Sequence, residues 1–220
     1  AGCDSCQFRC TVVVVLNVSY KVGETPKAPR PLNAASIMNR RRQTVPSPWV
    51  QRFARLTSTG GTALDLACGG GRNGRWLRAR GLTVTFLDRD VSALIELSNS
   101  EIIEADLESR GPFPLKGRTF DCVVVTNYLW RDILDDICAA VTPGGLLIYE
   151  TFGLGNESFG RPRNPDFLLK PGELAAAVKP TFRLIGYEPG LRPEPSAPVV
   201  PPIAASNPKP NGTRLPGEAP

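Results

Sequence analysis

Thr62-Ala63-Leu64-Asp65-Leu66-Ala67-Cys68-Gly69-Gly70-Gly71-Arg72-Asn73-Gly74 is the stretch that decides the fold. Its apolar start predicts a short buried strand, which the glycines end. From Arg72 to Arg80 the apolar residues fall at helical spacing. A strand that passes through a glycine turn into a helix presents free backbone N–H groups, and glycine lets a ligand approach them closely. The stretch therefore predicts a ligand site at this turn.

Two kinds of ligand fit this turn, and a tight turn that binds nothing stays a third interpretation. Residues Gly69 to Gly74 match the G-x-G-x-x-G pattern of dinucleotide folds, which is a weak signal when it stands alone. Asp65 lies four residues before Gly69, at the end of the apolar run, where we expect it to face the ligand. A carboxylate there would repel a pyrophosphate and attract a cationic amino group. The turn therefore favours a ligand that carries such a group.

The size and charge of the chain suit one α/β domain with tails. It has 220 residues and a net charge of +5. Some of that charge lies in Arg40–Arg42 and some along the helix that begins at Arg72. These clusters are compatible with nucleic acid, but a solvated surface is the favoured interpretation, so nucleic acid is not favoured as a partner.

The histidine and cysteine content limits the possible chemistry. The chain has no histidine, which excludes a histidine-based triad, a histidine general base and the commoner zinc sites. Cys3 and Cys6 have zinc-ligand spacing, but no second pair follows at a suitable distance, so no metal is predicted. Cys68, Cys122 and Cys138 lie in apolar segments and indicate a reducing, cytoplasmic location.

The first 44 residues differ in pattern from the body of the chain. The only methionine is Met38, and residues 1–44 are expected to be a tail that is disordered or translated from upstream of the true start. The apolar run of residues 12–16 is too short to span a membrane, although residues 11–20 are compatible with an isolated strand. We therefore expect a domain over residues 45–205, a disordered tail over 206–220, and no membrane association.

Strands and helices alternate along the body of the chain. A helix is predicted over residues 45–56, with Ser47 as its N-cap, Pro48 in its first turn, and an apolar face that includes Leu56. Later helices are predicted over 133–140 and from Pro171 onward, and a turn at 143–145. Further strands are expected over 81–88, 102–108, 120–130, 146–151, 182–188 and 198–200.

This order predicts a Rossmann-like, doubly wound, mostly parallel α/β sheet with an antiparallel closing strand. Ligands of such sheets bind beyond the carboxyl ends of the strands. A long polar loop over residues 152–170 is expected to overhang that edge. Polar residues close five successive strands there: Asp65, Asp88, Asp106, Asn127 and Glu150.

The chain from about Ser47 to Ser206 resembles the class I S-adenosylmethionine-dependent methyltransferases, near their tellurite-resistance-like bacterial branch. Residues 64–72 resemble the first motif of that family, with Ala67 where many members have glycine. Residues 86–88 resemble the second motif, 104–107 the third, 127–131 the fourth, and 143–145 the turn before the fifth strand.

The resemblance implies an enzyme that transfers a methyl group from S-adenosylmethionine to an acceptor, with a small molecule as the favoured acceptor. Asp65, Arg72 and the backbone from Ala67 through Cys68 and Gly69 to Gly71 would hold the methionine part. Asp88 would bind the ribose, and Asp106 with Leu107 the adenine. Asn127 would lie near both substrates, and Tyr128 and Glu150 would face the acceptor. Valine at Gly69 or Gly71 is expected to abolish cofactor binding without unfolding the protein.

Two alternatives remain at this point. An NAD(P)-dependent oxidoreductase would explain Asp88 equally well, but the sequence contains no Tyr-x-x-x-Lys pair. A methyltransferase-like RNA-binding protein without activity would need a basic groove rich in aromatic residues, whereas the arginines here are spread out.

Overall fold

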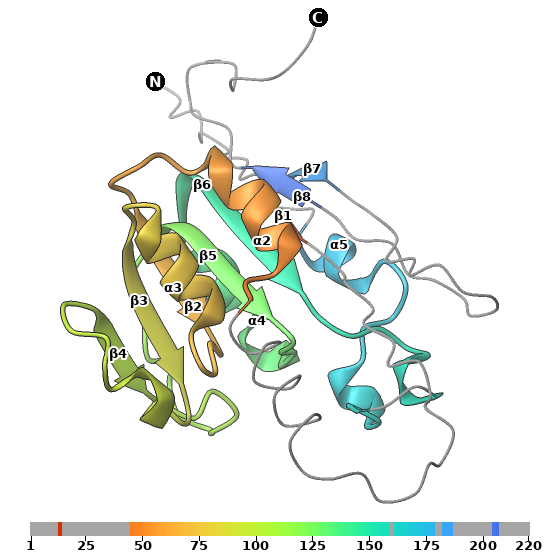
Figure 1. The fold of residues 1–220 in the computed structure, drawn as a ribbon. Helices are drawn as coiled ribbons and strands as arrows, with labels where there is room; N and C mark the ends of the chain where they lie inside the picture. Colours follow the sequence, from red (N-terminus) through yellow and green to blue (C-terminus); the bar gives the residue numbers. More distant parts are fainter. Residues whose placement is uncertain (1–12, 15–44, 159–160, 179–181, 187–203, 207–220) are drawn as a thin grey trace, which may run out of the picture.

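The computed structural model describes residues 13–14, 45–158, 161–178, 182–186 and 204–206. In this part of the chain, strands form one sheet in the order β4-β3-β2-β5-β6-β8-β7, and β1 pairs with β6 beside that path (Figure 1). The strands are β1 (Val13–Val14), β2 (Thr62–Leu66), β3 (Thr83–Asp88), β4 (Glu101–Glu104), β5 (Phe120–Thr126), β6 (Val141–Glu150), β7 (Arg183–Gly186) and β8 (Ala204–Ser206).

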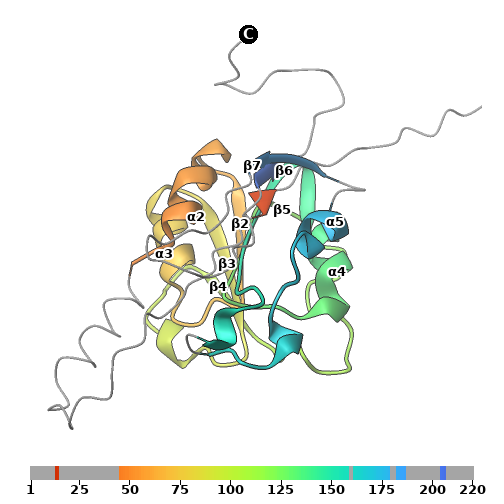
Figure 2. The same ribbon diagram turned by 90° about the vertical axis from the view of Figure 1, so that its right-hand side faces the viewer.

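Helices cover both faces of the sheet. The α-helices are α2 (Pro48–Phe53), α3 (Arg72–Ala79), α4 (Leu134–Ala139) and α5 (Glu173–Val178). Short 3₁₀ turns are formed by Ala54–Leu56, Ser92–Leu94, Arg131–Ile133, Asn156–Ser158 and Pro165–Phe167. Figure 2 shows α2 and α3 on one face of the sheet and α4 and α5 on the other. The molecule is therefore a three-layer α/β structure.

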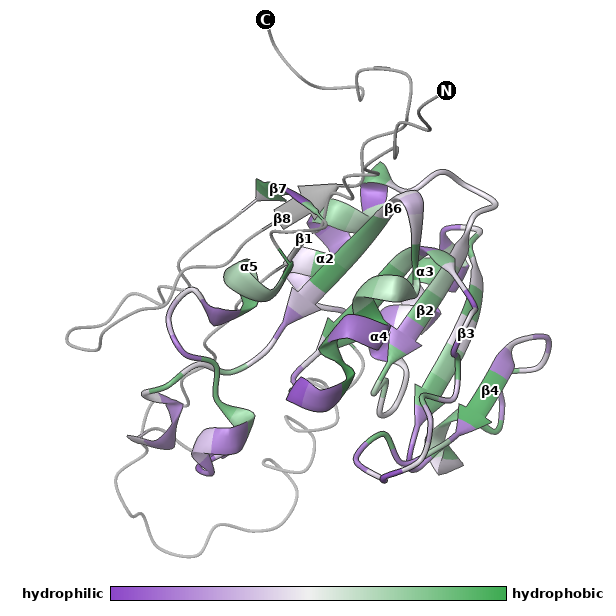
Figure 3. Ribbon diagram, turned by 180° about the vertical axis from the view of Figure 1, so that it is seen from behind, coloured by the Kyte–Doolittle hydropathy of each residue, from purple (hydrophilic) through white to green (hydrophobic). Residues whose placement is uncertain are grey.

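The apolar strands are explained by burial on both faces. On one face of the sheet, Ala63 of β2 belongs to the hydrophobic core that includes residues of α2 and α3. On the other face, Leu64 and Leu66 belong to the core that includes residues of α4 and α5. Figure 3 shows the resulting hydrophobic strands in the middle of the sheet. Strands β2 to β6 are parallel to one another, and β8 is antiparallel to β6 and β7. The predicted fold class, including the antiparallel closing strand, is confirmed.

The direction of winding reverses between β2 and β5. From β2 the chain moves outward through β3 to β4, and then returns to add β5 and β6 on the other side of β2. The loops that follow β2 and β5 therefore diverge to opposite faces and leave a crevice at the carboxyl ends of these strands. Leu66 pairs with Val125, so the turn after β2 and Asn127 after β5 begin side by side.

The N-terminal helix is capped as the sequence predicts. The Ser47 hydroxyl accepts hydrogen bonds from the backbone N–H groups of Trp49 and Val50, at 3.2 and 3.5 Å. Trp49, Val50 and Phe53 are buried against the sheet. Leu56 is 43% exposed, so its expected place on the apolar face is wrong, because the chain turns into a 3₁₀ conformation at Ala54.

Two expectations about the sheet need correction, and a third is not tested. The last described strand is Ala204–Ser206, and the predicted strand at 198–200 lies outside the described residues. Strand Val13–Val14 is not isolated, since it pairs in parallel with Ile148 and Tyr149 of β6. The expected turn at 143–145 lies within β6. The register with β5 shifts there, since Phe120 pairs with Val141 and Cys122 pairs with Leu146. No helix among the described residues has the length and apolar character to cross a membrane.

Candidate functional site

The glycine turn after β2 is fixed by hydrogen bonds from its backbone N–H groups to β3. The Cys68 N–H donates to the Leu87 carbonyl at 3.1 Å, and the Gly69 N–H donates to Oδ2 of Asp88 at 2.7 Å. Ala67, Gly69 and Gly71 all have positive φ, at 51°, 52° and 71°. Alanine at Ala67 therefore adopts a left-handed conformation that glycine would adopt more easily.

Asp65 lies beneath this turn. Its side chain is fully buried, and Oδ2 accepts a hydrogen bond of 2.6 Å from the Gly74 N–H, while Oδ1 is buried with no partner in the described structure. Burial raises the pKa of Asp65 to about 7, against the lowering effects of the Gly74 N–H and the charge of Arg72. The carboxyl group thus supports the start of α3 from inside, and it is not on the cavity wall where the sequence places it.

A cavity of about 490 Å³ opens at the carboxyl ends of the strands. Its wall includes six of the predicted site residues: Ala67, Asp88, Asp106, Leu107, Asn127 and Tyr128. Five others lie in or beneath the neighbouring turn and are not part of the cavity wall: Asp65, Cys68, Gly69, Gly71 and Arg72. The structure therefore brings the strand-end residues together around one hollow, with the glycine turn beside it.

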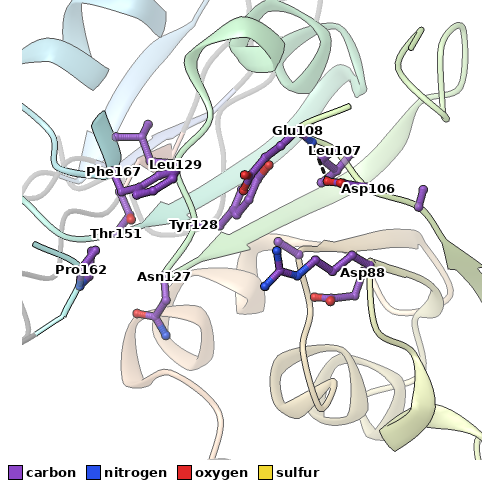
Figure 4. Close-up of a pocket in the computed structure, with 13 residues that line it drawn as sticks. Asp88, Asp106, Leu107, Glu108, Asn127, Tyr128, Leu129, Thr151, Pro162 and Phe167 are labelled. Atoms are coloured by element: carbon purple, nitrogen blue, oxygen red, sulfur yellow. Dashed lines mark hydrogen bonds between the residues drawn. The ribbon is translucent and has the colours of Figure 1, made fainter. Parts of the chain in front are cut away.

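The cavity has two chemically different halves. Figure 4 shows Asp88, Asp106, Leu107 and Glu108 on one side and Leu129, Thr151, Pro162 and Phe167 on the other, with Asn127 and Tyr128 between them. Three carboxylates therefore lie in the first half, and the residues labelled in the second half are uncharged. Arg89 and Ala105 also line the cavity. The two halves are called the acidic half and the uncharged half below.

Tyr128 forms the boundary between the halves. Its hydroxyl is buried without a hydrogen-bond partner among the described residues. Burial raises its pKa, and the charges of Glu108, Asp106 and Asp88 raise it further. The phenol is therefore protonated at neutral pH and is available as a hydrogen-bond donor.

Glu150 is placed differently from the expectation that it faces an acceptor. It is 3% exposed, its carboxylate accepts a hydrogen bond from the Ser47 hydroxyl, and it is not part of the cavity wall. The Ser47 N–H donates to Oδ1 of Asn73, whose amide donates to the Thr126 hydroxyl, each at 2.9 Å. This buried polar chain joins the N-cap of α2 to the ends of β5 and β6 behind the cavity.

The loop over the uncharged half is held by Arg131. Its guanidinium donates to both carboxylate oxygens of Glu173, at 2.6 and 3.0 Å, and to the carbonyls of Asp166 and Leu168. Phe167, which lines the cavity, lies between these two carbonyl-bearing residues. Arg131 thus fixes the segment that forms one wall.

Several cavity residues were missed by the sequence analysis. They are Arg89, Ala105, Glu108, Leu129 and Thr151, all within two residues of a predicted site residue or strand end. Pro162 and Phe167 belong to the 152–170 loop that was expected to overhang the site. The first five residues could have been found by extending each predicted strand-end motif by one or two positions. No group of histidine, cysteine and acidic residues suited to a metal ion occurs among the described residues.

Comparison with known proteins identifies the family. The sequence model of a methyltransferase domain family matches residues 38–168. The chain belongs to this family. The resemblance to class I S-adenosylmethionine-dependent methyltransferases is therefore confirmed, and with it the prediction of an enzyme that uses S-adenosylmethionine. No curated protein matches the chain.

Solved structures share the fold at low sequence identity. A TehB-like S-adenosylmethionine-dependent methyltransferase from Corynebacterium glutamicum has a TM-score of 0.56 at 19% identity, covering 80% of this chain and 97% of the other. TehB from Haemophilus influenzae has a TM-score of 0.55 at 20% identity, covering 73% and 61%. The PH0226 protein from Pyrococcus horikoshii has a TM-score of 0.55 at 17% identity, covering 80% and 93%. At these identities the likeness concerns the fold.

Proposed function

We propose that this methyltransferase binds S-adenosylmethionine between the glycine turn and the acidic half of the cavity, and a small-molecule methyl acceptor in the uncharged half. The observation that carries the proposal is the meeting of the glycine turn with Asp88, Asp106 and Asn127 at the switch point of the sheet. The residues suit the cofactor in charge, because three carboxylates of the cavity wall outnumber its one arginine, Arg89, and the ligand carries a sulfonium and an ammonium group.

The proposed placement follows the order of the strands. Asp88 would accept hydrogen bonds from the ribose hydroxyls, and Asp106 with Leu107 would contact the adenine. The backbone from Ala67 to Gly71 and the side chain of Arg72 would hold the methionine part, with Asp65 supporting the turn from below. A β-carbon added at Gly69 or Gly70 would meet no protein atom within 4 Å, so this side of the turn is open to a ligand.

The bound cofactor supplies an electrophilic methyl group, activated by its sulfonium. The protein's own task is then to exclude water and to align the acceptor with the methyl group, in line with the bond to sulfur. Asn127 and Tyr128, at the boundary of the two halves, are suited to orient the acceptor. The Tyr128 phenol would donate a hydrogen bond rather than act as a base, since its pKa is raised.

A small molecule suits the uncharged half better than nucleic acid. Two arginines of α3 that could form a basic surface are used to hold the segment that follows β3. Arg75 donates to the Ala93 carbonyl at 2.8 Å, and Arg78 donates to the Ser98 carbonyl at 2.7 Å. Their positions are thus explained by internal contacts, and RNA binding is not needed to account for them.

The proposal is tested by a methyl-transfer screen. The protein is incubated with methyl-labelled S-adenosylmethionine and separate pools of small molecules, proteins and RNA. We expect label in the small-molecule pool. The Asp88→Ala variant should lose this transfer, whereas Asp90→Ala, a neighbouring exposed carboxylate outside the cavity wall, should keep it. Transfer only to protein or RNA would contradict the proposed acceptor.

A further inference from the structure

The charge of the cavity is concentrated in one half, and this restricts the acceptor. Asp88, Asp106 and Glu108 lie in the acidic half, and Arg89 is also part of the cavity wall. The side chains of the uncharged half, from Leu129, Thr151, Pro162 and Phe167, offer no formal charge to a ligand. A charged group transferred from water into such surroundings loses solvation without gaining an ion-pair partner.

The polar atoms of the uncharged half fit an uncharged ligand. Thr151 is 1% exposed, and its hydroxyl is buried with no hydrogen-bond partner in the described structure, although the residue lines the cavity. A buried hydroxyl without a partner is costly, and a ligand that supplies a neutral donor or acceptor removes that cost. The Asn127 carboxamide, which also lines the cavity, adds a neutral donor and acceptor.

The walls of this half indicate the shape of the ligand. Phe167 and Pro162 come from the overhanging loop, Leu129 from the segment after β5, and the Tyr128 ring faces them from the boundary (Figure 4). Two aromatic rings and two apolar side chains suit a flat, apolar ring, because aromatic rings pack well face to edge or offset. The Arg131 contacts with Asp166 and Leu168 keep the Phe167 wall in place.

We propose that the methyl acceptor is a small aromatic or heteroaromatic compound that is uncharged at neutral pH. This inference rests on the proposed function. A lone pair of the acceptor atom forms the new bond to the methyl carbon while the methyl–sulfur bond breaks and its electron pair passes to sulfur. The cofactor leaves as neutral-sulfur S-adenosylhomocysteine, and the positive charge passes to the acceptor atom, which releases a proton to water where it carries one.

An anionic acceptor is the main competing idea, since Arg161 and Arg163 lie in the loop above. Both are exposed, and neither lines the cavity. Glu157, an acid of the same loop, accepts a hydrogen bond of 2.8 Å from the Gly155 N–H. Neither guanidinium is therefore part of the wall that would contact an acceptor in the uncharged half.

The experiment uses the full chain saturated with S-adenosylhomocysteine and three ligands of similar size. Quinoline is the uncharged probe, 2-naphthoate the anion and 2-naphthylmethylamine the cation, and their dissociation constants are measured by ligand-observed NMR titration. We expect quinoline to bind at least about ten-fold more tightly than either charged probe, which corresponds to about 1.4 kcal/mol.

Two cavity variants and one control complete the test. Thr151→Val and Phe167→Ala should each weaken quinoline binding by about three- to ten-fold, the range expected for one neutral contact, with unchanged affinity for S-adenosylhomocysteine. Tyr149→Phe deletes a buried hydroxyl that is outside the cavity wall, and it should change neither the quinoline affinity nor the affinity for S-adenosylhomocysteine. Any one of three results overturns the inference. A charged probe binds as tightly as quinoline or more tightly, quinoline shows no saturable binding, or both cavity variants keep the quinoline affinity of the parent protein. Failure of the parent protein to bind S-adenosylhomocysteine would instead contradict the proposed function.

Discussion

The backbone N–H of Gly69 donates a hydrogen bond of 2.7 Å to Oδ2 of Asp88. The bond joins the glycine turn to the acid that ends β3, so the two sequence motifs form one unit. Oδ1 of Asp88 accepts from the Asp90 N–H at 3.0 Å. Each carboxylate oxygen keeps a further lone pair, so ribose hydroxyls can bind without breaking these contacts.

Replacing Asp88 separates its ligand role from its structural role. Asp88→Ala should weaken S-adenosylhomocysteine binding by about 1–3 kcal/mol, the loss expected for charge-assisted hydrogen bonds. Asp88→Asn keeps an acceptor for Gly69 and should have an intermediate effect. Calorimetry and thermal melting are measured together, with Asp90→Ala as the control. A lower melting temperature with unchanged affinity would mean that Asp88 only holds the turn.

The two outer glycines of the turn should respond differently to valine. A β-carbon at Gly71 would lie 2.7 Å from the Leu94 side chain and 3.0 Å from Phe86, so Gly71→Val should destabilise the fold itself. A β-carbon at Gly69 meets nothing within 4 Å, and Gly69→Val should lower cofactor affinity at least about ten-fold for a stability loss of about 1–2 kcal/mol. We therefore still expect an intact fold for Gly69→Val, and no longer expect one for Gly71→Val.

Gly117 provides the matched control. It also has positive φ, at 82°, with no atom within 4 Å of an added β-carbon, but it lies in the loop before β5. Gly117→Val should therefore show the backbone strain without the loss of affinity. If Gly69→Val binds S-adenosylhomocysteine as tightly as Gly117→Val does, the cofactor does not lie against this turn.

Asp65 should make stability depend on pH in a defined window. Its pKa rises from 3.8 to about 7 on folding, so between these values the folded state holds a proton that the unfolded state releases. The stabilising effect is complete below about pH 4 and is lost as pH rises through about 7, at roughly 1.4 kcal/mol per pH unit. Asp65→Asn removes this titration and keeps an oxygen acceptor for Gly74.

The measurement is denaturant unfolding of both proteins from pH 4 to pH 8. The stability of the parent protein relative to Asp65→Asn should fall across the window and level off above it. Parallel curves would show that Asp65 has an ordinary pKa in the folded protein.

Arg131 should order the loop beside the uncharged half. Arg131→Met removes its bonds to Glu173 and to the two loop carbonyls, and should increase amide exchange over residues 166–173 and lower stability by about 1–3 kcal/mol. Arg118→Met is the control, because the Arg118–Glu101 pair is bidentate but more exposed, and should cost less than about 1 kcal/mol. Unchanged exchange in Arg131→Met would show that the loop is held by other contacts.

The parts of the fold that depend on local pattern could be predicted from the sequence. Apolar runs gave β2, β3 and β5, and Ser47 with Pro48 gave the start of α2, because these features depend on neighbouring residues. Strand Ala204–Ser206 and the pairing of Val13 could not be predicted, since both depend on partners in β6 that are distant in sequence.

In the candidate site, too, the residues that belong to a local sequence pattern could be predicted, and those that depend on distant contacts could not. Asp88 and Asn127 were found because they end recognisable strands, and both line the cavity. Thr151 lacks a motif of its own, and its significance comes from a buried hydroxyl without a partner among the described residues. The burial of Asp65 was missed because the sequence does not show that α3 turns back over it to place the Gly74 N–H at 2.6 Å.

The central claim is tested most directly by titrating the full chain with S-adenosylhomocysteine in a calorimeter, with NADH and a short RNA titrated in parallel. The account predicts saturable binding of S-adenosylhomocysteine at one site per chain, reduced in Asp88→Ala, and no saturable binding of the other two ligands. Binding of NADH or RNA in place of S-adenosylhomocysteine, or no binding of S-adenosylhomocysteine at all, would contradict it.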